Sequence, residues 1–500
     1  MEKRFIMSID QGTTGTRVIF FNYDGSIHSS AYREIRQIYP FPGWVEHDPR
    51  EYWDTTMTCT QEAMQTGGVK PEEIAAIGIT CQRETTILWD KDTGEPVYNA
   101  IVWQSRQTAE ICEDLKRRGY EDKVRQKTGL LIDAYFSSTK IKFILDKYPE
   151  LKDKIAKGKI LFGNIDSFLI WKLSGGAYHV EDYSNAARTL LLNIHTLQWD
   201  DELLDALQIP RNILPKVVPS SGIMAVTSKA VFFGQEVPIA GDAGDQSAAT
   251  FGQTCFEPGM AKNTYGTSLA MMMNIGKEPI SSNHGLTTDL LWMQGDKVEY
   301  AFEGVVFIGG AIIQWLRDGL KIIKDSSESS EKASRVSDTG GVYIVPAFIG
   351  LCAPYWDMYA RGTIVGITRG TSDEHICRAA IESMAYQTRD VLESMNADMA
   401  GGEFKSLRVD GGATRSELLL QFQADILGLP VELPQVTEMA ALGAAYLAGL
   451  GVGIWKDKQE IAKHWKVARV YEPSMKSDRR EELYDGWKRA VSRSLDWDKH

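Results

Sequence analysis

Short apolar runs separated by glycine-rich polar turns dominate the start of the chain. "FIMSI" (5–9) and "RVIFF" (17–21) flank a Gly-Thr turn, which predicts two paired strands. Asp48-Pro49 then supplies a capping acid and a proline at the first helical position, predicting a helix through "REYWDTTMTCTQEAMQ". "EEIAAIGIT" (72–80) ends in a further strand. Strands and helices that follow one another in this way predict an α/β architecture.

The same kind of unit returns in the second half of the chain. "AKNTYGTSLAMMM" (261–273) again predicts strand, Gly-Thr turn and strand. "LRVDGGATRSELLLQFQADILGLPVEL" (407–433) predicts strand, Gly-Gly turn, helix and strand, with Gly428 and Pro430 ending the helix. Because 500 residues exceed what one core normally holds, we predict two domains, 1–252 and 253–500.

Composition excludes several classes of protein. The net charge of -12 argues against a broad nucleic-acid or anionic-membrane surface. The most apolar run, "GVVFIGGAII" (304–313), has about half the length of a membrane span, so we expect no membrane insertion. The six cysteines form no C-x-x-C pair and the histidines no metal-binding spacing, which favours free thiols in a cytoplasmic protein.

The turn in "DQGTTGTR" (10–17) has two interpretations. Taken alone it is typical of a hairpin, since Gly-Thr turns are common there. Glycines also let a ligand approach the backbone, and successive N–H groups form an anion-binding nest. Thr13 and Thr14 add hydroxyl donors, and Asp10 could hold magnesium through water. The second Gly-Thr turn at 266–267 favours the phosphate interpretation.

Other known nucleotide and hydrolase motifs are absent from the sequence. No G-x-x-x-x-G-K-[ST] occurs, and no strand-linked G-x-G-x-x-G opens a helix, so neither a P-loop nor a Rossmann site is expected. "GTSLA" (266–270) differs from the G-x-S-x-G of serine hydrolases and leads into a strand.

Two charged motifs follow apolar strands. Arg83 and Glu84 in "CQRETT" are either an edge pair exposed to water or a pair that lines a pocket and binds neutral hydroxyls. In "GDAGDQSAA", Asp242 and Asp245 could cap the helix that follows. Asp245 could instead accept a proton from a substrate hydroxyl, as a catalytic aspartate does in phosphoryl transfer. Trp103 and Tyr135 are core aromatics or the wall of a small-ligand pocket.

With these motifs the chain resembles the FGGY carbohydrate kinases, most closely the branch that phosphorylates glycerol. The resemblance runs nearly end to end and includes "DQGTTGTR", "YPFPGWVEHDP", "GITCQRETT", "YNAIVWQSR", "WDDELLDALQIPR", "AGDAGDQSAATFGQ", "MAKNTYGT", "GGAIIQWLRD", "PAFIGLCAPYWDMYARG", "ESMAYQTRDVLESM", "LRVDGGATR" and "ALGAAYLAGL". It implies two ribonuclease-H-like domains of the actin and Hsp70 ATPase type, with a catalytic cleft between them. ATP, magnesium and glycerol are the expected ligands, and a homodimer or homotetramer the expected assembly.

The resemblance also assigns site residues position by position. Asp245 is the expected general base, and Asp10 the magnesium-side carboxylate. The expected polyol-binding residues are Arg83, Glu84, Trp103, Tyr135, Asp245 and Gln246. The expected nucleotide-binding residues are Thr13, Thr14, Gly15, Arg17, Thr267, Gly310, Gln314, Gly411 and Arg415.

Several positions depart from the family pattern. Ala270 and Ser268 stand where glycerol-specific relatives usually carry an aromatic residue and a glycine, so a slightly larger polyol such as a tetritol, or a ketose, stays open as the substrate. Arg415 replaces a usual asparagine, which puts the contact on the adenine side in question. "SKAVFFGQEVP" (228–238) lacks the Gly-Gly-Thr-Arg turn linked to fructose-1,6-bisphosphate inhibition, and Phe232 replaces a phosphorylatable histidine. We therefore expect neither control.

One alternative comes from a different class of protein. A non-catalytic actin-like or Hsp70-like module would bind ATP and use its hinge for assembly. Such a module would not need Arg83, Glu84 or Tyr135, so these residues favour the kinase.

Overall fold

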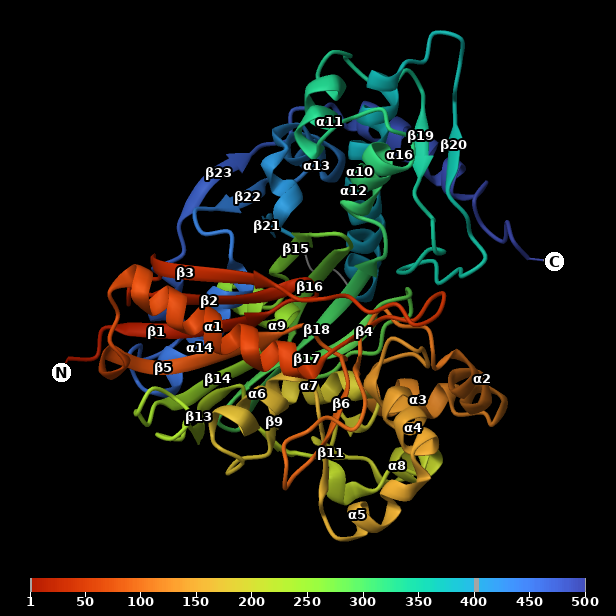
Figure 1. The fold of residues 1–500 in the computed structure, drawn as a ribbon. Helices are drawn as coiled ribbons and strands as arrows, with labels where there is room; N and C mark the ends of the chain where they lie inside the picture. The colour runs from red at the N-terminus through yellow and green to blue at the C-terminus, as the bar shows by residue number, and fades with distance from the viewer. Residues whose placement is uncertain (1, 400–403, 500) are drawn as a thin grey trace.

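A single large sheet runs through the molecule and connects both halves of the chain (Figure 1). The computed structural model describes residues 2–399 and 404–499, and within them thirteen strands pair in the order β23-β22-β21-β15-β16-β18-β17-β13-β14-β5-β1-β2-β3. The strands are β1 (Phe5–Gln11), β2 (Gly15–Phe21), β3 (Ile27–Glu34), β5 (Ile74–Cys81), β13 (Ser221–Val226), β14 (Pro238–Gly244), β15 (Ala261–Tyr265), β16 (Leu269–Gly276), β17 (Thr287–Gln294), β18 (Lys297–Val306), β21 (Leu407–Asp410), β22 (Val431–Pro434) and β23 (Val467–Tyr471).

The sheet contains the same strand arrangement twice. In the order β3-β2-β1-β5-β14, two antiparallel pairings are followed by two parallel ones. The order β18-β16-β15-β21-β22 repeats this pattern. The two arrangements meet where Ser221 of β13 pairs with Gln294 of β17. The predicted α/β class and the two strand–Gly-Thr turn–strand units are confirmed.

Helices cover the sheet and form a lobe at each end of it. They are α1 (Pro49–Gly67), α2 (Ala109–Arg117), α3 (Glu121–Thr128), α4 (Ser137–Lys147), α5 (Lys152–Ala156), α6 (Ile165–Leu173), α7 (Tyr183–Ala186), α8 (Asp201–Leu207), α9 (Asp245–Gly252), α10 (Ala311–Asp318), α11 (Ser326–Ala333), α12 (Asp373–Asp398), α13 (Glu417–Leu427), α14 (Met439–Gly451), α15 (Lys458–Ala462) and α16 (Ser477–Val491). Figure 1 shows α2, α3, α4, α5 and α8 gathered in the lower lobe, and α10 to α13 with α16 in the upper one. Among the helices of the described residues, none combines the length and apolar character that a membrane span requires.

Short two-stranded sheets complete the lobes. They pair β4 (Glu46–His47) with β7 (Ala100–Ile101), β6 (Ile87–Asp90) with β8 (Ile160–Gly163), β9 (Val180–Asp182) with β12 (Lys216–Val218), β10 (Leu192–Asn193) with β11 (Gln198–Trp199), and β19 (Tyr343–Val345) with β20 (Thr363–Val365).

Local signals in the sequence set the helix ends. The Asp48 carboxylate accepts a hydrogen bond from the backbone N–H of Arg50 at 3.0 Å and so caps α1. Gly428 ends α13 in the left-handed conformation, at φ 70°, which a side chain rarely adopts. Both helix boundaries agree with the sequence prediction.

The late helix α14 packs against the first half of the chain. It contacts α9 and also β5, β14 and β1 of the first strand set. A Cβ atom on Gly443 would lie 1.8 Å from the carbonyl oxygen of Ala248, and one on Gly252 would lie 2.2 Å from that of Met439. The two helix backbones therefore touch, and only glycine fits at these two positions.

Candidate active site

The carboxyl ends of three neighbouring parallel strands form the floor of the site. Cys81 at the end of β5 pairs with Gln11 of β1 on one side and with Gly244 of β14 on the other. The next residues of each strand therefore leave the sheet at one edge, where ligands commonly bind in α/β proteins. These residues are the Gly12 turn, the Arg83-Glu84 pair and Asp245. The register alone explains why motifs so far apart in the sequence meet here.

Arg83 connects both halves of the chain. Its side chain is 3% exposed, and its Nε lies 3.4 Å from Oδ1 of Asp245. Its Nη2 also donates to Glu303 of β18, in the second half. Glu84 is 1% exposed. The interpretation of Arg83 and Glu84 as an exposed edge pair is wrong, because β5 lies inside the sheet.

Five buried side chains form a network of ion pairs, which we call the paired-charge cluster; they are Arg83, Arg188, Glu84, Asp289 and Glu303. Arg188 Nε lies 2.5 Å from Glu84 Oε1, and its Nη1 lies 2.5 Å from Asp289 Oδ1 and 2.8 Å from Glu303 Oε2. Burial alone would raise the pKa of Glu303, but the guanidiniums of Arg188 and Arg83 outweigh it and lower this pKa to about 2.

The sequence prediction missed three members of this cluster. Each stands as a single charge inside an otherwise apolar run, as Glu303 does in "YAFEGVVF" and Asp289 in "LTTDLLWM". Charged side chains are almost never fully buried without a partner. A single charge within an apolar run is therefore the sequence feature that could have indicated a buried ion pair. The partners cannot be assigned from the sequence, because they lie about a hundred residues away or more.

The backbone at Glu84 is held in the left-handed region, at φ 64°. Its carbonyl oxygen accepts hydrogen bonds from Ser137 Oγ at 3.1 Å and from Lys140 Nζ at 3.0 Å. Lys140 also donates to the carbonyl of Tyr135 at 2.5 Å, and burial lowers the pKa of Lys140 to about 7. Lys140, which the sequence analysis did not identify, thus fixes the positions of Glu84 and Tyr135 relative to each other.

Two aromatic side chains link the Arg83 region to the Gly12 turn. The rings of Trp103 and Tyr135 meet edge to face, with centroids 5.6 Å apart. Trp103 Nε1 donates to Thr13 Oγ1 at 2.9 Å. The Tyr135 hydroxyl makes no hydrogen bond with any residue that the structure describes, and Arg188 lies 5.4 Å from the centre of its ring. Both aromatics therefore lie between the Gly12 turn and the Arg83 region.

Asp245 opens α9, and Gly244 occupies the cap position before it. Oδ1 of Asp245 accepts from the backbone N–H of Gln246 at 2.8 Å, and its side chain is 32% exposed. The Gln246 Oε1 accepts from Lys262 Nζ, which also donates to the carbonyl of Ala270 at 3.2 Å. Lys262, likewise missed from the sequence, connects the start of α9 to the strand that carries Ala270.

Asp10 offers a free carboxylate beside Asp245. It is partly exposed, and its carboxylate accepts no hydrogen bond within the described residues. Burial raises its pKa to about 7; Arg17 opposes this shift, and Glu438 and Asp245 add to it. A nearby cation would favour the ionised form, so this carboxylate fits a magnesium ligand.

The Gly12 turn is the predicted hairpin, closed by a hydrogen bond from Gly12 N–H to the Gly15 carbonyl at 3.0 Å. A Cβ on Gly12 would meet only that carbonyl, at 3.5 Å, so the turn is open for a ligand. A Cβ on Gly15 would lie 2.4 Å from the Arg33 carbonyl, so packing on β3 requires this glycine. Thr14 is exposed, whereas Arg17 is ion-paired with Glu438.

Three loops of the second half lie together at the equivalent edge. Gly309 N–H donates to the Thr267 carbonyl at 2.9 Å, and Gly310 N–H to the Gly266 carbonyl at 2.8 Å. Gly411 has φ 92°, and a Cβ there would lie 2.6 Å from the Tyr265 carbonyl. Thr267, Gly310 and Gly411 are therefore neighbours.

The two remaining nucleotide candidates flank these loops. Gln314 follows on the first turn of α10 and is exposed. Arg415 ends the short 3-10 helix Gly412–Arg415; it is exposed and makes no ion pair or hydrogen bond with the part of the chain that the structure describes. Both side chains are therefore available to a ligand.

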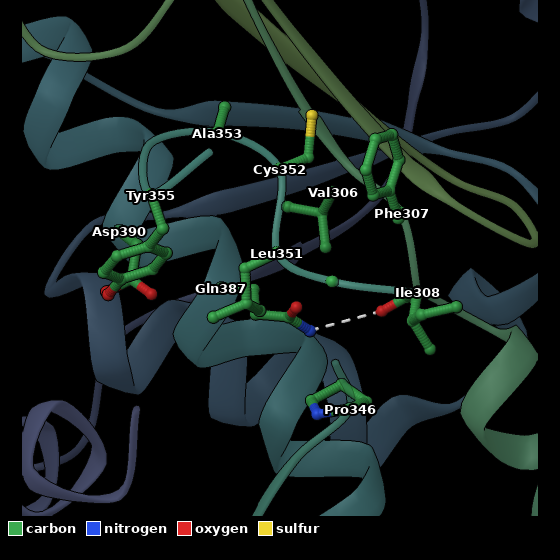
Figure 2. Close-up of a pocket in the computed structure, with 11 residues that line it drawn as sticks. Val306, Phe307, Ile308, Pro346, Leu351, Cys352, Ala353, Tyr355, Gln387 and Asp390 are labelled. Carbon is green, nitrogen blue, oxygen red and sulfur yellow. Dashed lines mark hydrogen bonds between the residues drawn. The ribbon is translucent and has the colours of Figure 1, made fainter. Parts of the chain in front are cut away.

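A small cavity lies behind the loop that joins β18 to α10. Figure 2 shows Val306, Phe307 and Ile308 on one side of it and Gln387 of α12 on the other. Gln387 Nε2 donates to the Ile308 carbonyl at 3.3 Å. None of the predicted site residues lines this cavity, and the hydrogen bond from Gln387 links α12 to the loop that leads to Gly310.

Comparison with known proteins shows the family. The model of the FGGY family of carbohydrate kinases, N-terminal domain, matches residues 5–252, and that of the C-terminal domain matches residues 261–452. The chain belongs to the FGGY family of carbohydrate kinases. This FGGY chain is 59% identical over 496 residues to glycerol kinase 2 of Thermotoga maritima, covering 99% of this chain and all of that protein.

Two further proteins resemble this FGGY chain over its whole length. It is 59% identical over 498 residues to a glycerol kinase of Carboxydothermus hydrogenoformans, covering all of this chain and 99% of the other. The crystal structure of Plasmodium falciparum glycerol kinase with ADP superposes with a TM-score of 0.92 at 35% identity, covering 99% of both chains. The actin-like two-domain fold predicted from the sequence is confirmed.

Proposed function

We propose that the protein transfers the γ-phosphoryl group of ATP to a terminal hydroxyl of glycerol, giving sn-glycerol 3-phosphate. The observation that carries the proposal is the meeting of Arg83, Asp245 and Gln246 at one sheet edge, next to the Gly12 turn. The full-length similarity to glycerol kinases supports the choice of substrate.

Asp245 acts as the general base in this proposal. Its carboxylate is partly exposed and held by the Gln246 N–H and by Arg83, so it is oriented toward the site. It accepts the proton of the attacking hydroxyl, while the oxygen forms the new bond to phosphorus and ADP leaves. Arg83, Glu84, Gln246 and the Tyr135 hydroxyl bind the polyol oxygens, and Trp103 packs on its carbons.

The phosphates lie between the two halves of the chain in this proposal. Thr13, Thr14 and the N–H groups of the Gly12 turn approach them from the first half. Thr267, Gly310, Gln314, Gly411 and Arg415 bind the nucleotide from the second half. Asp10 holds magnesium, which offsets phosphate charge when bound. Closing the predicted cleft between the domains, 1–252 and 253–500, keeps water from the reacting phosphate.

Ala270 supports a second candidate, an FGGY kinase acting on a larger polyol such as a tetritol. Ala270 is 7% exposed, and its carbonyl accepts from the same lysine that bonds to Gln246. Alanine has a much smaller side chain than the aromatic residue usual at this position, so it would leave more room beside the substrate in this second candidate.

A coupled assay of ADP release tests both candidates. It compares glycerol, erythritol, threitol, dihydroxyacetone and xylulose with the wild type and with Ala270→Phe. The proposal expects the highest kcat/KM for glycerol, and a four-carbon preference that Ala270→Phe abolishes would favour the alternative. ATP binding without transfer to any of these acceptors would contradict both and favour a non-catalytic module.

We also infer a cytoplasmic homodimer or homotetramer. The described cysteines are all free and buried, which suits a reducing compartment. Light scattering on the eluting protein measures the assembly directly, and a monomer at working concentration would contradict it.

A further inference from the structure

Three fully buried carboxylates meet beneath the Arg83 region, and we call them the acidic cluster: Asp166, Asp182 and Asp242. Asp166 lies in the first turn of α6, Asp182 ends β9, and Asp242 lies within β14. One ligand oxygen of each lies within 4.8 Å of the others. Three separate elements thus direct negative groups to one point.

No positive side chain compensates these groups. None of the three forms an ion pair with a lysine, arginine or histidine of the described residues. Glu181, which precedes Asp182, adds a further buried carboxylate whose charge acts on the cluster. Buried carboxylates without a counter-charge are strongly unfavourable, so protons or a cation must compensate them.

The hydrogen bonds around the cluster leave several oxygens without a donor. Asp182 accepts from the backbone N–H groups of Ser184 and Asn185 at 2.9 Å and from Ser220 Oγ at 2.7 Å, so its carboxylate is firmly oriented. By contrast, both oxygens of Asp242 and Oδ2 of Asp166 are buried and accept no hydrogen bond from any other group of the described residues. Asp166 and Asp242 lie within hydrogen-bond distance of each other, and two carboxylates in such a contact need a proton or a cation between them.

We propose that the acidic cluster binds one divalent cation of the calcium class through oxygen ligands alone. Calcium takes oxygen ligands at about 2.3–2.6 Å, so two ligands on opposite sides of the ion stand about 5 Å apart. The three ligand oxygens all lie within 4.8 Å of one another, close enough to contact one such ion together. Magnesium prefers to keep several waters and demands strict octahedral geometry, which this closed site of protein ligands serves less well.

The ion would connect directly to the start of α9. Ser184 Oγ donates to Asp182 at 2.9 Å and accepts from the Gly244 N–H at 2.9 Å. Asp242 itself precedes Asp245 by three residues on the same strand and turn. A cation in the acidic cluster would therefore stiffen the backbone that carries Asp245. This site is separate from the magnesium ligand Asp10, and its existence does not depend on the proposed function.

Metal analysis of the full-length protein without nucleotide tests the proposal. The protein is stripped with a chelator and then offered calcium, manganese or magnesium chloride, and bound metal and Tm are measured. We expect one tightly held calcium or manganese ion per chain, and a rise in Tm of several degrees when the ion is restored. Absence of both in the wild type would overturn the proposal and would leave protons as the compensating charge.

Variants locate the ion. Asp242→Asn removes one ligand charge at constant size and is expected to abolish the tightly held ion and its Tm effect. Asp166→Asn repeats the test from a different element, should the first variant fail to fold. Asp10→Asn and Asp390→Asn are matched controls, since Asp390 is equally buried but bonded to Tyr484 and Trp487. Unchanged ion content in Asp242→Asn and Asp166→Asn, or its loss in Asp10→Asn, would place the ion elsewhere and overturn the proposal.

Discussion

Two buried groups of charges lie near β14, the strand that leads into Asp245, and they differ in how they are compensated. The paired-charge cluster holds three carboxylates against the guanidiniums of Arg83 and Arg188. The acidic cluster holds three carboxylates with no ion-pair partner in the described residues. Both are almost fully removed from solvent.

The contrast shows two ways in which buried carboxylates can be compensated. In the first cluster the chain supplies its own counter-ions, which also bind together the two halves through Glu303 and Asp289. In the second cluster the counter-charge must come from solution, as protons or as a metal ion. The stability of the two clusters should therefore respond to different variables.

The largest effect is expected at Asp245, which contacts Arg83 of the paired-charge cluster. Asp245→Asn keeps its contacts but cannot accept the proton of a hydroxyl, so kcat should fall by about 10²–10⁴-fold. Glycerol binding, measured by calorimetry, should change little. Asp205→Asn, an exposed position on α8, is the control. Normal turnover of Asp245→Asn would mean that a different group accepts the proton.

The next effect tests the paired-charge cluster. Arg188→Met removes one cation and leaves Glu84, Asp289 and Glu303 without it, so the free energy of unfolding should fall by about 3–5 kcal/mol. Arg211→Met breaks an exposed pair with Asp201 and should cost less than about 1 kcal/mol. Urea unfolding measures both variants. Equal losses would show that the buried network contributes nothing beyond a surface pair.

Two carboxylates, Glu303 of the paired-charge cluster and Asp166 of the acidic cluster, should affect stability in opposite pH windows. The pKa of Glu303 is lowered to about 2, so its contribution is complete above its unfolded value near 4.5 and is lost as the pH falls toward 2. The pKa of Asp166 is raised to about 7, mainly by burial and then by Asp182. Its native form holds the proton longer than the unfolded form, so without a cation stability falls as the pH rises from about 4 to about 7.

Unfolding followed from pH 3 to pH 8, in chelator and in calcium, measures this contrast. Asp10, Glu382 and Asp390, whose pKa values are also raised to about 7, add to the same slope. Glu84 and Asp289 of the paired-charge cluster, whose pKa values burial raises, add to it as well. The contribution of the acidic cluster to the slope of unfolding free energy against pH is therefore the portion that is lost when calcium is added or in Asp242→Asn. If neither calcium nor Asp242→Asn changes this slope, the acidic cluster does not titrate in this range.

The smallest effect concerns the link between the acidic cluster and Asp245. Ser184→Ala removes the hydroxyl between Asp182 and the Gly244 N–H, and kcat should fall by about fivefold, as for the loss of one hydrogen bond of about 1 kcal/mol. Ser174→Ala, which removes a similarly buried hydroxyl bonded to the Trp171 carbonyl, should leave kcat unchanged. Equal effects of the two variants on kcat would show that the acidic cluster does not influence catalysis through Ser184.

The repeated hairpins could be predicted because their signals are local. Apolar runs on both sides of the Gly12 and Gly266 turns specify paired strands, and the register of β1, β5 and β14 then brings Asp10, Arg83 and Asp245 to one edge. The resemblance to a known family supplied the residue roles, which local pattern left open between core and site.

The charge networks could not be predicted in the same way. Arg188 and Glu303 are more than a hundred residues apart, and nothing in either segment specifies the other. Lys140 and Lys262 act through backbone carbonyls and an amide, which have no signature in the sequence. Asp242 was identified only as a possible cap, because its convergence with Asp166 and Asp182 depends on the tertiary fold.

The contact between α9 and α14 also sets an order of events during synthesis. The first strand set ends with β14 at Gly244 and α9 ends at Gly252, but the helix that covers β5 and β14 begins at Met439. At typical ribosomal rates this helix emerges roughly ten to forty seconds later. Until then Gly78 and Gly241, whose faces are filled by the α14 backbone, lie open. The amino-terminal half of the nascent chain therefore cannot bury this face of its sheet until residues close to the carboxyl end have been synthesised. During this interval the exposed face would be the natural target of a chaperone.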